Sequence, residues 1–306
     1  MKDPKKIELS PPWDGPVATA AGMSENPLWD FEQIEVPHLW AKYAVDGKGV
    51  NAFVIDSGIV PHHLFSHKPF VALSFLDDTT DPHDANGHGT WCCGKIGAKG
   101  VGIAPGCTLH SLRTLDDQGN GYTYYTTDAL RWINRHPDPH IVNMSLGSTY
   151  NSVQQAKACK DLWDRGCLVI AAAGNEDTND LSYPAAYDGV VAVAATDSLK
   201  KRAWFSNYGD HIVVSAPGVS CYSTYLNSQF RKLQGTSMAS PTVAGLLALG
   251  YSWLLKNKPG WPRTEMRDHL IDCLKRTAID LGQAGKDDFH GYGGINGPGF
   301  MAAVTS

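Results

Sequence analysis

The sequence predicts an α/β fold of three layers, in which helices cover both faces of a mostly parallel central sheet. Short apolar runs of strand length alternate along the chain with longer runs of helix length. Turn residues such as Gly, Pro, Asn and Asp flank the short runs. The short runs are apolar throughout, which is typical of parallel strands that are buried on both faces.

Six short apolar runs predict the strands of this sheet. The first covers residues 49–56 and ends in a carboxylate, Asp56. The others are expected at residues 109–113, 141–146, 167–172, 190–195 and 211–215. Helices are expected from His88 to Ile96, over residues 124–134 and 152–165, and from Ser237 to about residue 256, the longest apolar run. Because ligands of such sheets bind at the carboxyl ends of the strands, we expect the functional residues there.

Length and composition favour one folded domain behind a short arm. The chain has 306 residues, of which 42% are hydrophobic and 19% charged, a balance typical of globular rather than disordered proteins. Residues 1–25 are rich in Pro, Ala and Gly and have no sustained periodicity. We interpret them as an N-terminal arm or short propeptide-like extension, and residues 26–306 as the domain that carries the function.

Charge, hydropathy and cysteine content exclude several classes of protein. A net charge of −5 and the lack of any long Lys/Arg run argue against nucleic-acid partners. The sequence contains no run of about 18 uninterrupted apolar residues, so we predict no membrane span. The N-terminus has no apolar segment of a signal peptide, so we expect a cytoplasmic protein or the processed form of a secreted one. Seven cysteines cannot all pair, and their scattered positions favour reduced thiols.

Four polar residues stand in glycine-rich segments at expected strand ends and helix starts. Ser237 is expected at the start of the longest apolar helix. The free N–H groups and the helix dipole there stabilise negative charge that develops on a carbonyl oxygen during a reaction. A serine hydroxyl becomes a good nucleophile when a base accepts its proton, and His88 is the candidate base. Asp56 supplies the buried acceptor that orients the imidazole. Asn175 can donate a side-chain N–H into an oxyanion hole, together with the backbone N–H of Ser237.

Each of these residues alone has an ordinary structural explanation. Asp56 and Asn175 could be turn residues, and Ser237 could be an N-cap. His88 is one of 12 histidines. Their joint occurrence in the order Asp, His, Asn, Ser, each in the same kind of context, favours nucleophilic catalysis instead.

Three motifs around these residues resemble those of one known family. They are Val54-Ile55-Asp56-Ser57-Gly58, Gly87-His88-Gly89-Thr90 and Gly235-Thr236-Ser237-Met238-Ala239-Ser240-Pro241. With them, the chain from about residue 29 onward resembles the subtilisin-like serine proteases (subtilases, peptidase family S8). The resemblance implies a subtilisin-like αβα fold, a catalytic domain over residues 26–306, and a serine endopeptidase that acts through an acyl-enzyme at Ser237. No cofactor is required for this chemistry.

The resemblance also implies where a peptide or protein substrate lies. An extended peptide would pair between Gly119-Asn120-Gly121 and Ser145-Leu146-Gly147. The side chain before the scissile bond would enter a slot walled by residues 145–147 and by Ala172-Ala173-Gly174. These small walls predict broad specificity with a preference for large apolar residues. The sequence departs from the family at Ser148, where a second glycine is usual, and Ser182 is a candidate for the pocket floor.

The resemblance to proteinase K-like members concerns a thiol and a metal. Cys92 follows His88 by one helical turn, so its sulfur is expected beneath the imidazole, either as a small buried hydrophobe or in a redox or mercury-sensing role. The carbonyls of Pro184 and Ala186 with the carboxylate of Asp197 are candidates for a structural calcium site. The alternative is that these three residues bind no metal.

Two other functions and two interpretations of the arm stay open. A peptide ligase or macrocyclase on the same fold would resolve the acyl-enzyme with an amine instead of water, and a non-catalytic binding module would keep the cleft without the chemistry. The arm is either an inhibitory segment that crosses the cleft, as in intracellular subtilisins, or a disordered tail. Pro11 and Pro12 would resist cleavage if they lay in the cleft.

Overall fold

A parallel sheet of seven strands forms the centre of the protein, seen in a computed structural model that describes residues 6–8, 26–66 and 70–306. The strand order is β3-β4-β2-β6-β7-β8-β9, and each neighbouring pair is parallel. The sheet confirms the predicted fold class and contains all six predicted strands, with ends shifted by a few residues. The strands are β2 (Asn51–Asp56), β3 (Val71–Ser74), β4 (Thr108–Arg113), β6 (Ile141–Met144), β7 (Leu168–Ala172), β8 (Val190–Thr196) and β9 (Ile212–Pro217).

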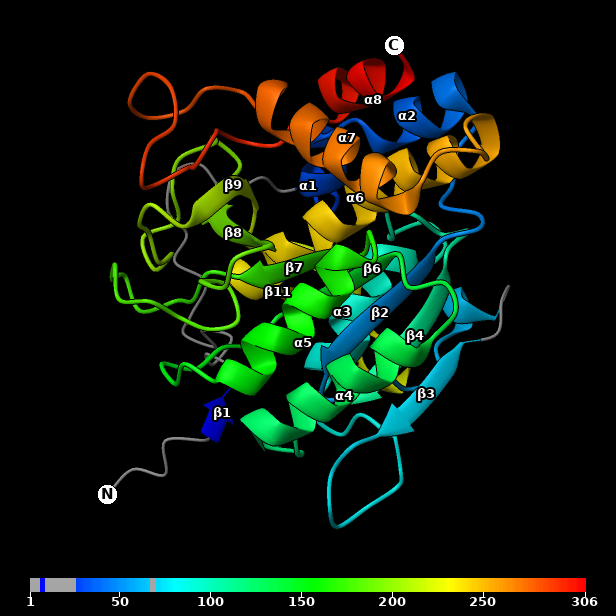
Figure 1. The fold of residues 1–306 in the computed structure, drawn as a ribbon, viewed down its shortest axis with the longest axis vertical. Helices are drawn as coiled ribbons and strands as arrows, with labels where there is room; N and C mark the ends of the chain where they lie inside the picture. Colours follow the sequence, from blue (N-terminus) through cyan, green and yellow to red (C-terminus); the bar gives the residue numbers. More distant parts are fainter. Residues whose placement is uncertain (1–5, 9–25, 67–69) are drawn as a thin grey trace.

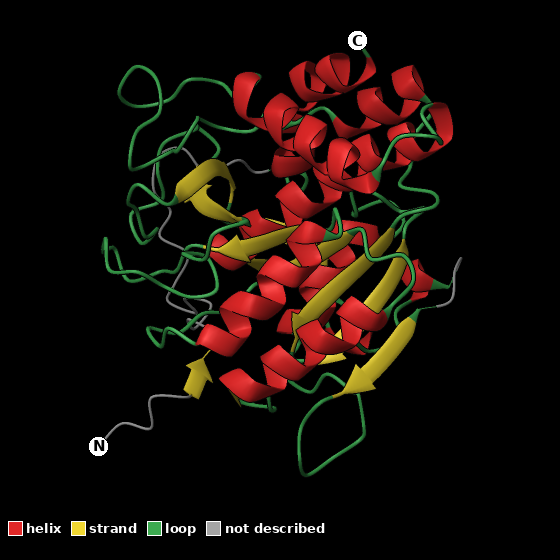
Figure 2. Ribbon diagram, in the orientation of Figure 1, coloured by secondary structure: helices red, strands yellow, loops and turns green. Residues whose placement is uncertain are grey.

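Helices cover both faces of this sheet, as Figures 1 and 2 show. Successive residues of a strand point to opposite faces, so each strand contributes to two cores. In β2, Val54 belongs to the apolar core shared with α3 and α6, whereas Phe53 belongs to the core shared with α4 and α5. These helices are α3 (His88–Gly97), α4 (Thr123–Arg135), α5 (Val153–Asp164) and α6 (Thr236–Asn257).

The longest helix, α6, is a core helix. By length and composition it could cross a membrane, but 89% of its 18-residue apolar window is buried inside the protein. Glycines allow close packing along it: a Cβ at Gly245 would lie 2.7 Å from the Cβ of Ile103. The helix begins at the carboxyl edge of the sheet, so its first turn faces the ends of the strands.

Smaller elements surround this framework, and the sequence patterns above did not predict them. Helices α2, α7 and α8 gather at one end of the molecule (Figure 1). Two short antiparallel pairs, β1 with β5 and β10 with β11, lie outside the main sheet. The bounds are α1 (Trp29–Gln33), α2 (Val36–Tyr43), α7 (Arg263–Arg276), α8 (Gly297–Thr305), β1 (Lys6–Glu8), β5 (Asn120–Tyr122), β10 (Cys221–Thr224), β11 (Phe230–Leu233), and the 3-10 turns η1 (His63–Phe65) and η2 (Leu226–Ser228).

Two further predictions concern the arm and the cysteines. Within residues 1–25 the structure describes Lys6–Glu8 alone, so Pro11 and Pro12 lie outside the described residues. The division between an arm and a domain at residue 25 stays a prediction. All seven cysteines are free and buried, which confirms the expectation of reduced thiols.

Candidate active site

Asp56 and His88 form a buried, hydrogen-bonded pair. Asp56 is the last residue of β2 and His88 the first of α3, so the two elements bring them to one edge of the sheet. His88 Nδ1 donates to Asp56 Oδ1 at 2.8 Å, and the two residues are 2% and 0% exposed. The other ring nitrogen, Nε2, is buried and has no hydrogen-bond partner among the described residues. With Nδ1 carrying the proton, Nε2 keeps a lone pair and can act as a base.

Electrostatics favour the protonated form of this imidazole. Burial by itself would lower the pKa of His88, but the charge and hydrogen bond of Asp56, helped by the charge of Asp84, raise it above the usual value. The site therefore stabilises the imidazolium that forms when His88 accepts a proton.

Ser237 lies in the first turn of α6 and is 4% exposed. Its Oγ donates to the carbonyl oxygen of Ser145 at 3.2 Å rather than to His88. Cys92 joins the two helices, because its Sγ lies 3.8 Å from His88 Nδ1 and 3.7 Å from the Ser237 carbonyl oxygen. Serine hydroxyls rotate, and catalytic hydrogen bonds are often formed only when substrate is bound. The hydroxyl of Ser237 and the imidazole of His88 therefore lie in one site without a hydrogen bond between them.

The thiol of Cys92 lies where the sequence predicted, next to the imidazole. The carboxylate of Asp56, the imidazole of His88 and this thiol lie within 4.8 Å of one another. Burial raises the pKa of Cys92 well above its usual range, and the charge of Asp56 raises it further. The thiol is therefore neutral, in keeping with a small buried hydrophobe.

Asn175 is held by Thr236, the residue before Ser237. Its Oδ1 accepts from Thr236 N at 2.8 Å and from Thr236 Oγ1 at 2.9 Å. The amide nitrogen therefore points the other way, toward Gly235, where a Cβ would lie 3.3 Å from it. Gly235 has φ +149°, a conformation that favours glycine. Because the first N–H groups of a helix lack intrahelical acceptors, the start of α6 and the Asn175 amide offer donors side by side.

The predicted substrate-binding segments lie around this edge. Ser145-Leu146-Gly147 follows β6, and Ala172-Ala173-Gly174 begins at the last residue of β7, the neighbouring strand. Both segments are largely buried, and Ala172 is 4% exposed. Ser182 packs on this region, because a Cβ at Gly147 would lie 2.6 Å from its Oγ. The structure thus brings together the two walls and the residue suggested for the floor.

The third predicted segment, Gly119-Asn120-Gly121, is already paired with another strand. It overlaps β5, which pairs antiparallel with β1 in the register Lys6 with Tyr122 and Ile7 with Gly121. Ile7 is 1% exposed and belongs to the same apolar core as Leu146. Part of the chain's own arm therefore occupies the edge at which we expected a substrate strand.

The residues suggested for calcium are partly engaged by the backbone. Asp197 Oδ1 accepts from the N–H groups of Leu199 and Lys201, each at 2.9 Å, and the carbonyl of Pro184 accepts from Tyr187 N at 3.1 Å. The second oxygen of Asp197 and the carbonyl of Ala186 complete the set of candidate ligands. Calcium takes six to eight oxygens, so waters would supply the rest of its shell.

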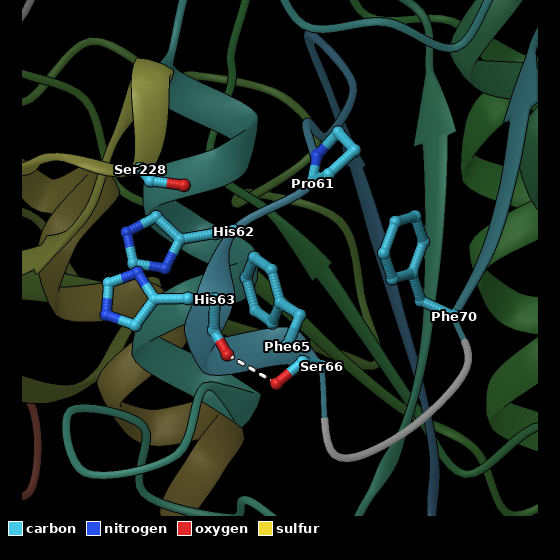
Figure 3. A pocket seen from close by; sticks show the side chains of 7 residues that line it. All are labelled: Pro61, His62, His63, Phe65, Ser66, Phe70 and Ser228. Atoms are coloured by element: carbon cyan, nitrogen blue, oxygen red, sulfur yellow. Dashed lines mark hydrogen bonds between the residues drawn. The ribbon is translucent and has the colours of Figure 1, made fainter.

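A separate cavity of about 480 Å³ lies near the β10–β11 hairpin (Figure 3). His62 stacks on His63 with ring centroids 4.4 Å apart. Both nitrogens of His62 are used, Nδ1 as acceptor from Leu64 N at 3.2 Å and Nε2 with the Gln229 carbonyl at 3.0 Å, so the ring has no lone pair left for a metal. None of the predicted site residues lines this cavity, which is formed by Pro61, His62, His63, Phe65, Ser66, Phe70 and Ser228.

Sequence reasoning did not single out three polar residues that support the site. Ser57 and Thr236 lie inside the recognised motifs, yet their contacts depend on segments far away in sequence. Asp84 stands four residues before His88, and the order Asp-Ala-Asn-Gly at residues 84–87 is typical of a turn. That pattern could have indicated a turn. It could not have indicated the five groups that donate hydrogen bonds to the carboxylate of Asp84.

Comparison with known proteins agrees with this geometry. The chain matches the subtilase family over residues 47–293. It is 38% identical over 273 residues to the minor extracellular protease Epr of Bacillus subtilis, covering 87% of this chain but 40% of that protein. It is 34% identical over 284 residues to M-protease of Shouchella clausii, covering 91% of this chain and 71% of that protein.

A third relative is similar in length. The chain is 35% identical over 273 residues to Subtilisin Savinase of Lederbergia lenta, covering 88% of this chain and 96% of that protein. Together with the parallel sheet and the Asp56–His88 pair, these matches show that the chain belongs to the subtilase family and is a subtilisin-like serine endopeptidase.

Proposed function

We propose that the protein hydrolyses peptide bonds through an acyl-enzyme formed at Ser237, with His88 as general base and Asp56 as the residue that orients it. The observation that carries this proposal is the buried imidazole whose Nδ1 is held by Asp56 at 2.8 Å while Nε2 has no partner among the described residues. The hydroxyl that needs a base belongs to the same cluster, on the first turn of α6.

The steps follow from these positions. Ser237 Oγ turns from the Ser145 carbonyl, attacks the substrate carbonyl carbon and gives its proton to His88 Nε2. The C–N bond breaks as His88 returns that proton to the leaving amine. A water molecule then attacks the acyl-enzyme, giving one proton to His88, which passes it back to Ser237 Oγ. The charge of Asp56 stabilises the imidazolium in both halves of the reaction.

The negative charge on the substrate oxygen needs preorganised donors. We assign this role to the amide nitrogen of Asn175 and the backbone N–H of Ser237. Thr236 supports the assignment, because its two bonds to Asn175 Oδ1 fix the direction of the amide nitrogen before substrate arrives. A donor that is already oriented costs no reorganisation in the transition state.

For specificity, we propose a broad preference with large apolar side chains before the scissile bond. The supporting feature is the small size of the wall residues, which are Gly147, Ala172, Ala173 and Gly174. Small walls leave a wide slot, and a large apolar substrate side chain fills such a slot better than a small one does. Ser182 Oγ lies against Gly147 and limits the depth of that space. Substrate main chain would pair with Gly119-Asn120-Gly121 by strand addition.

We also propose that residues 6–8 act as an inhibitory arm. The pairing of β1 with β5 supports this, because an extended segment on that edge competes with a substrate strand for the same backbone groups. Burial of Ile7 supplies apolar contact area that holds the segment there. The arm must leave, or be cut away, before a substrate can pair.

A calcium ion, where bound, is proposed to act on stability alone. The carbonyls of Pro184 and Ala186 and the second carboxylate oxygen of Asp197 would hold it and cross-link two loops. The chemistry rests on side chains elsewhere, so a chelator should lower the thermal midpoint of unfolding while kcat on a short peptide stays unchanged. A fall in kcat with no change in the midpoint would contradict this assignment.

The decisive experiment labels the serine. Purified protein lacking residues 1–25 is treated with a fluorophosphonate probe, beside a Ser237→Ala variant of the same length. We expect one label on Ser237 and cleavage of a peptide library with large apolar residues before the cut. A folded protein that takes no label would refute the proposal. Added amine nucleophiles separate hydrolysis from ligation, because a ligase would give mainly the aminolysis product.

A further inference from the structure

A second buried carboxylate lies between the two segments that carry Asp56 and His88. Asp84 is 0% exposed and stands in the loop before α3. The mechanism above gives it no part in bond making or proton transfer. A buried carboxylate is costly to maintain unless it is fully hydrogen-bonded, so its partners show what it holds.

Five donors surround this carboxylate. Its Oδ1 accepts from Ser57 Oγ at 2.9 Å, Gly87 N at 2.8 Å and Asn86 N at 3.1 Å. Its Oδ2 accepts from Thr90 N at 2.8 Å and Thr90 Oγ1 at 2.6 Å. One partner follows Asp56 directly in the chain, and the others lie within two residues of His88. The bonds therefore join the end of β2 to the start of α3.

The same hydroxyls continue the connection on the far side. Ser57 Oγ, which donates to Asp84, accepts from Gly89 N at 2.9 Å, and Thr90 Oγ1 accepts from Val60 N at 3.1 Å. The two segments also touch directly, because a Cβ at Gly89 would lie 2.3 Å from the Gly58 carbonyl oxygen. Each segment is thus tied to the other by bonds that either end on Asp84 or share a hydroxyl with it.

An amide could not replace this carboxylate. An asparagine at position 84 has one acceptor oxygen, and its NH₂ group would face either Thr90 N or the N–H groups of Asn86 and Gly87, donor against donor. The charge matters as well. Among the acidic groups, those of Asp56 and Asp84 raise the pKa of His88 against the lowering effect of burial.

We infer that Asp84 is a positioning residue for the reaction: its carboxylate clamps the end of β2 to the start of α3 and so fixes the separation at which His88 meets Asp56. The inference rests on the proposed roles of those two residues. This role accounts for a carboxylate that is buried beside the site. The hydrogen-bond donors of Asp84 come from the segments that carry Asp56 and His88.

The test compares Asp84→Asn with a matched variant elsewhere. Asp287 also accepts three backbone N–H groups, from Gln283, Phe289 and His290, but it lies in the loop after α7. Both variants are made in the full-length chain, and kcat and KM are measured from pH 5 to 9 beside those of the unmodified protein. For Asp84→Asn we expect kcat to fall about a hundredfold, because small misplacements of catalytic groups cost that much, with KM within about twofold.

The acid limb of the pH profile separates positioning from simple loss of stability. Removing the charge of Asp84 lowers the pKa of His88, so the limb should move to lower pH in Asp84→Asn and stay in place in Asp287→Asn. A folded Asp84→Asn variant with the wild-type kcat, or with a lowered kcat and an unmoved acid limb, overturns the inference.

A second pair of variants decides the matter if Asp84→Asn does not fold. Thr90→Val keeps the shape but removes the hydroxyl that donates to Asp84, whereas Thr90→Ser keeps the hydroxyl. We expect kcat to fall about tenfold in the first and to be largely retained in the second; equal values in both would overturn the inference. An unmodified protein that cleaves no peptide and takes no label would instead defeat the proposed function.

Discussion

Replacing Ile7 by Asp tests whether the arm controls access to the substrate edge. Ile7 lies opposite Gly121 in the β1–β5 pair and is 1% exposed. Gly121 has no side chain on that face, and the apolar core beneath includes Leu115 and Leu146. In the proposed inhibitory arrangement, the isoleucine side chain lies where a substrate side chain would otherwise lie.

The expected size of the effect follows from this burial. Burying an isoleucine contributes about 1.5–3 kcal/mol, and a carboxylate at the same place adds the cost of leaving water. At about 1.4 kcal/mol for each factor of ten, the arm should undock at least about tenfold more often. The gain in kcat/KM cannot exceed that of the protein lacking residues 1–25, which sets the ceiling.

The assay uses initial rates on a short chromogenic peptide, with the chain length verified by mass spectrometry because an active protease can trim its own arm. Ile7→Val is the matched control: it removes one methyl group, worth about 0.5–1.5 kcal/mol, and should change the rate by about tenfold at most, less than Ile7→Asp does. If Ile7→Asp and the protein lacking residues 1–25 both show the rate of the full-length chain, the inhibitory role is wrong.

Three further outcomes follow from titration and from a buried ion pair. Because the pKa of His88 is raised, kcat/KM should fall as pH drops through a value above 6.5; a midpoint below 6.5 would contradict the geometry. Lys95 Nζ lies 2.6 Å from Asp30 Oδ2 with both side chains 1% exposed, so Lys95→Met should cost about 3–5 kcal/mol in urea unfolding of the Ser237→Ala protein, and adding Asp30→Leu should restore most of it. Burial, with a smaller effect of His136, lowers the pKa of His110 to about 4, so its contribution to stability is complete above pH 6.5 and is lost as pH falls toward 4; thermal midpoints should fall less steeply in His110→Gln.

The core strands could be predicted because each is a short apolar run whose ends are marked by turn residues. The elements that escaped prediction depend on partners instead. β1 is three residues long and forms only against β5, and the β10–β11 hairpin follows β9 through a loop with mixed polarity. Helix α7 has a largely polar sequence, so its buried side chains, such as Leu270 and Leu274, gave a weak signal.

The site divides in the same way. The meeting of Asp56 with His88, and of Asn175 with the start of α6, could be predicted because these residues stand in local motifs at strand ends and helix starts. The direction of the Ser237 hydroxyl could not be predicted, because it depends on the carbonyl of Ser145, which is 92 residues away in sequence. The donors that converge on a buried carboxylate are likewise set by folding, because a turn sequence does not reveal which segments it will contact.

Helix α3 shows how the fold holds His88 in place. All ten of its residues are buried, so the helix has no face on which it can relax toward solvent. The carboxylate of Asp84 anchors its start, and Lys95, two turns after His88, is anchored by Asp30 from α1. Each anchor is a buried charged group, and losing its partner lowers the stability of the fold. When both partners are present, their contacts allow α3 only one position. Removal of an arm that ends before Asn26 keeps the Asp30 anchor, whereas a cut beyond residue 30 would leave Lys95 buried and unpaired on the helix that carries His88. Progressive truncation, followed by kcat and by the unfolding midpoint together, should therefore show activity rising up to residue 25 and both quantities collapsing once Asp30 is gone.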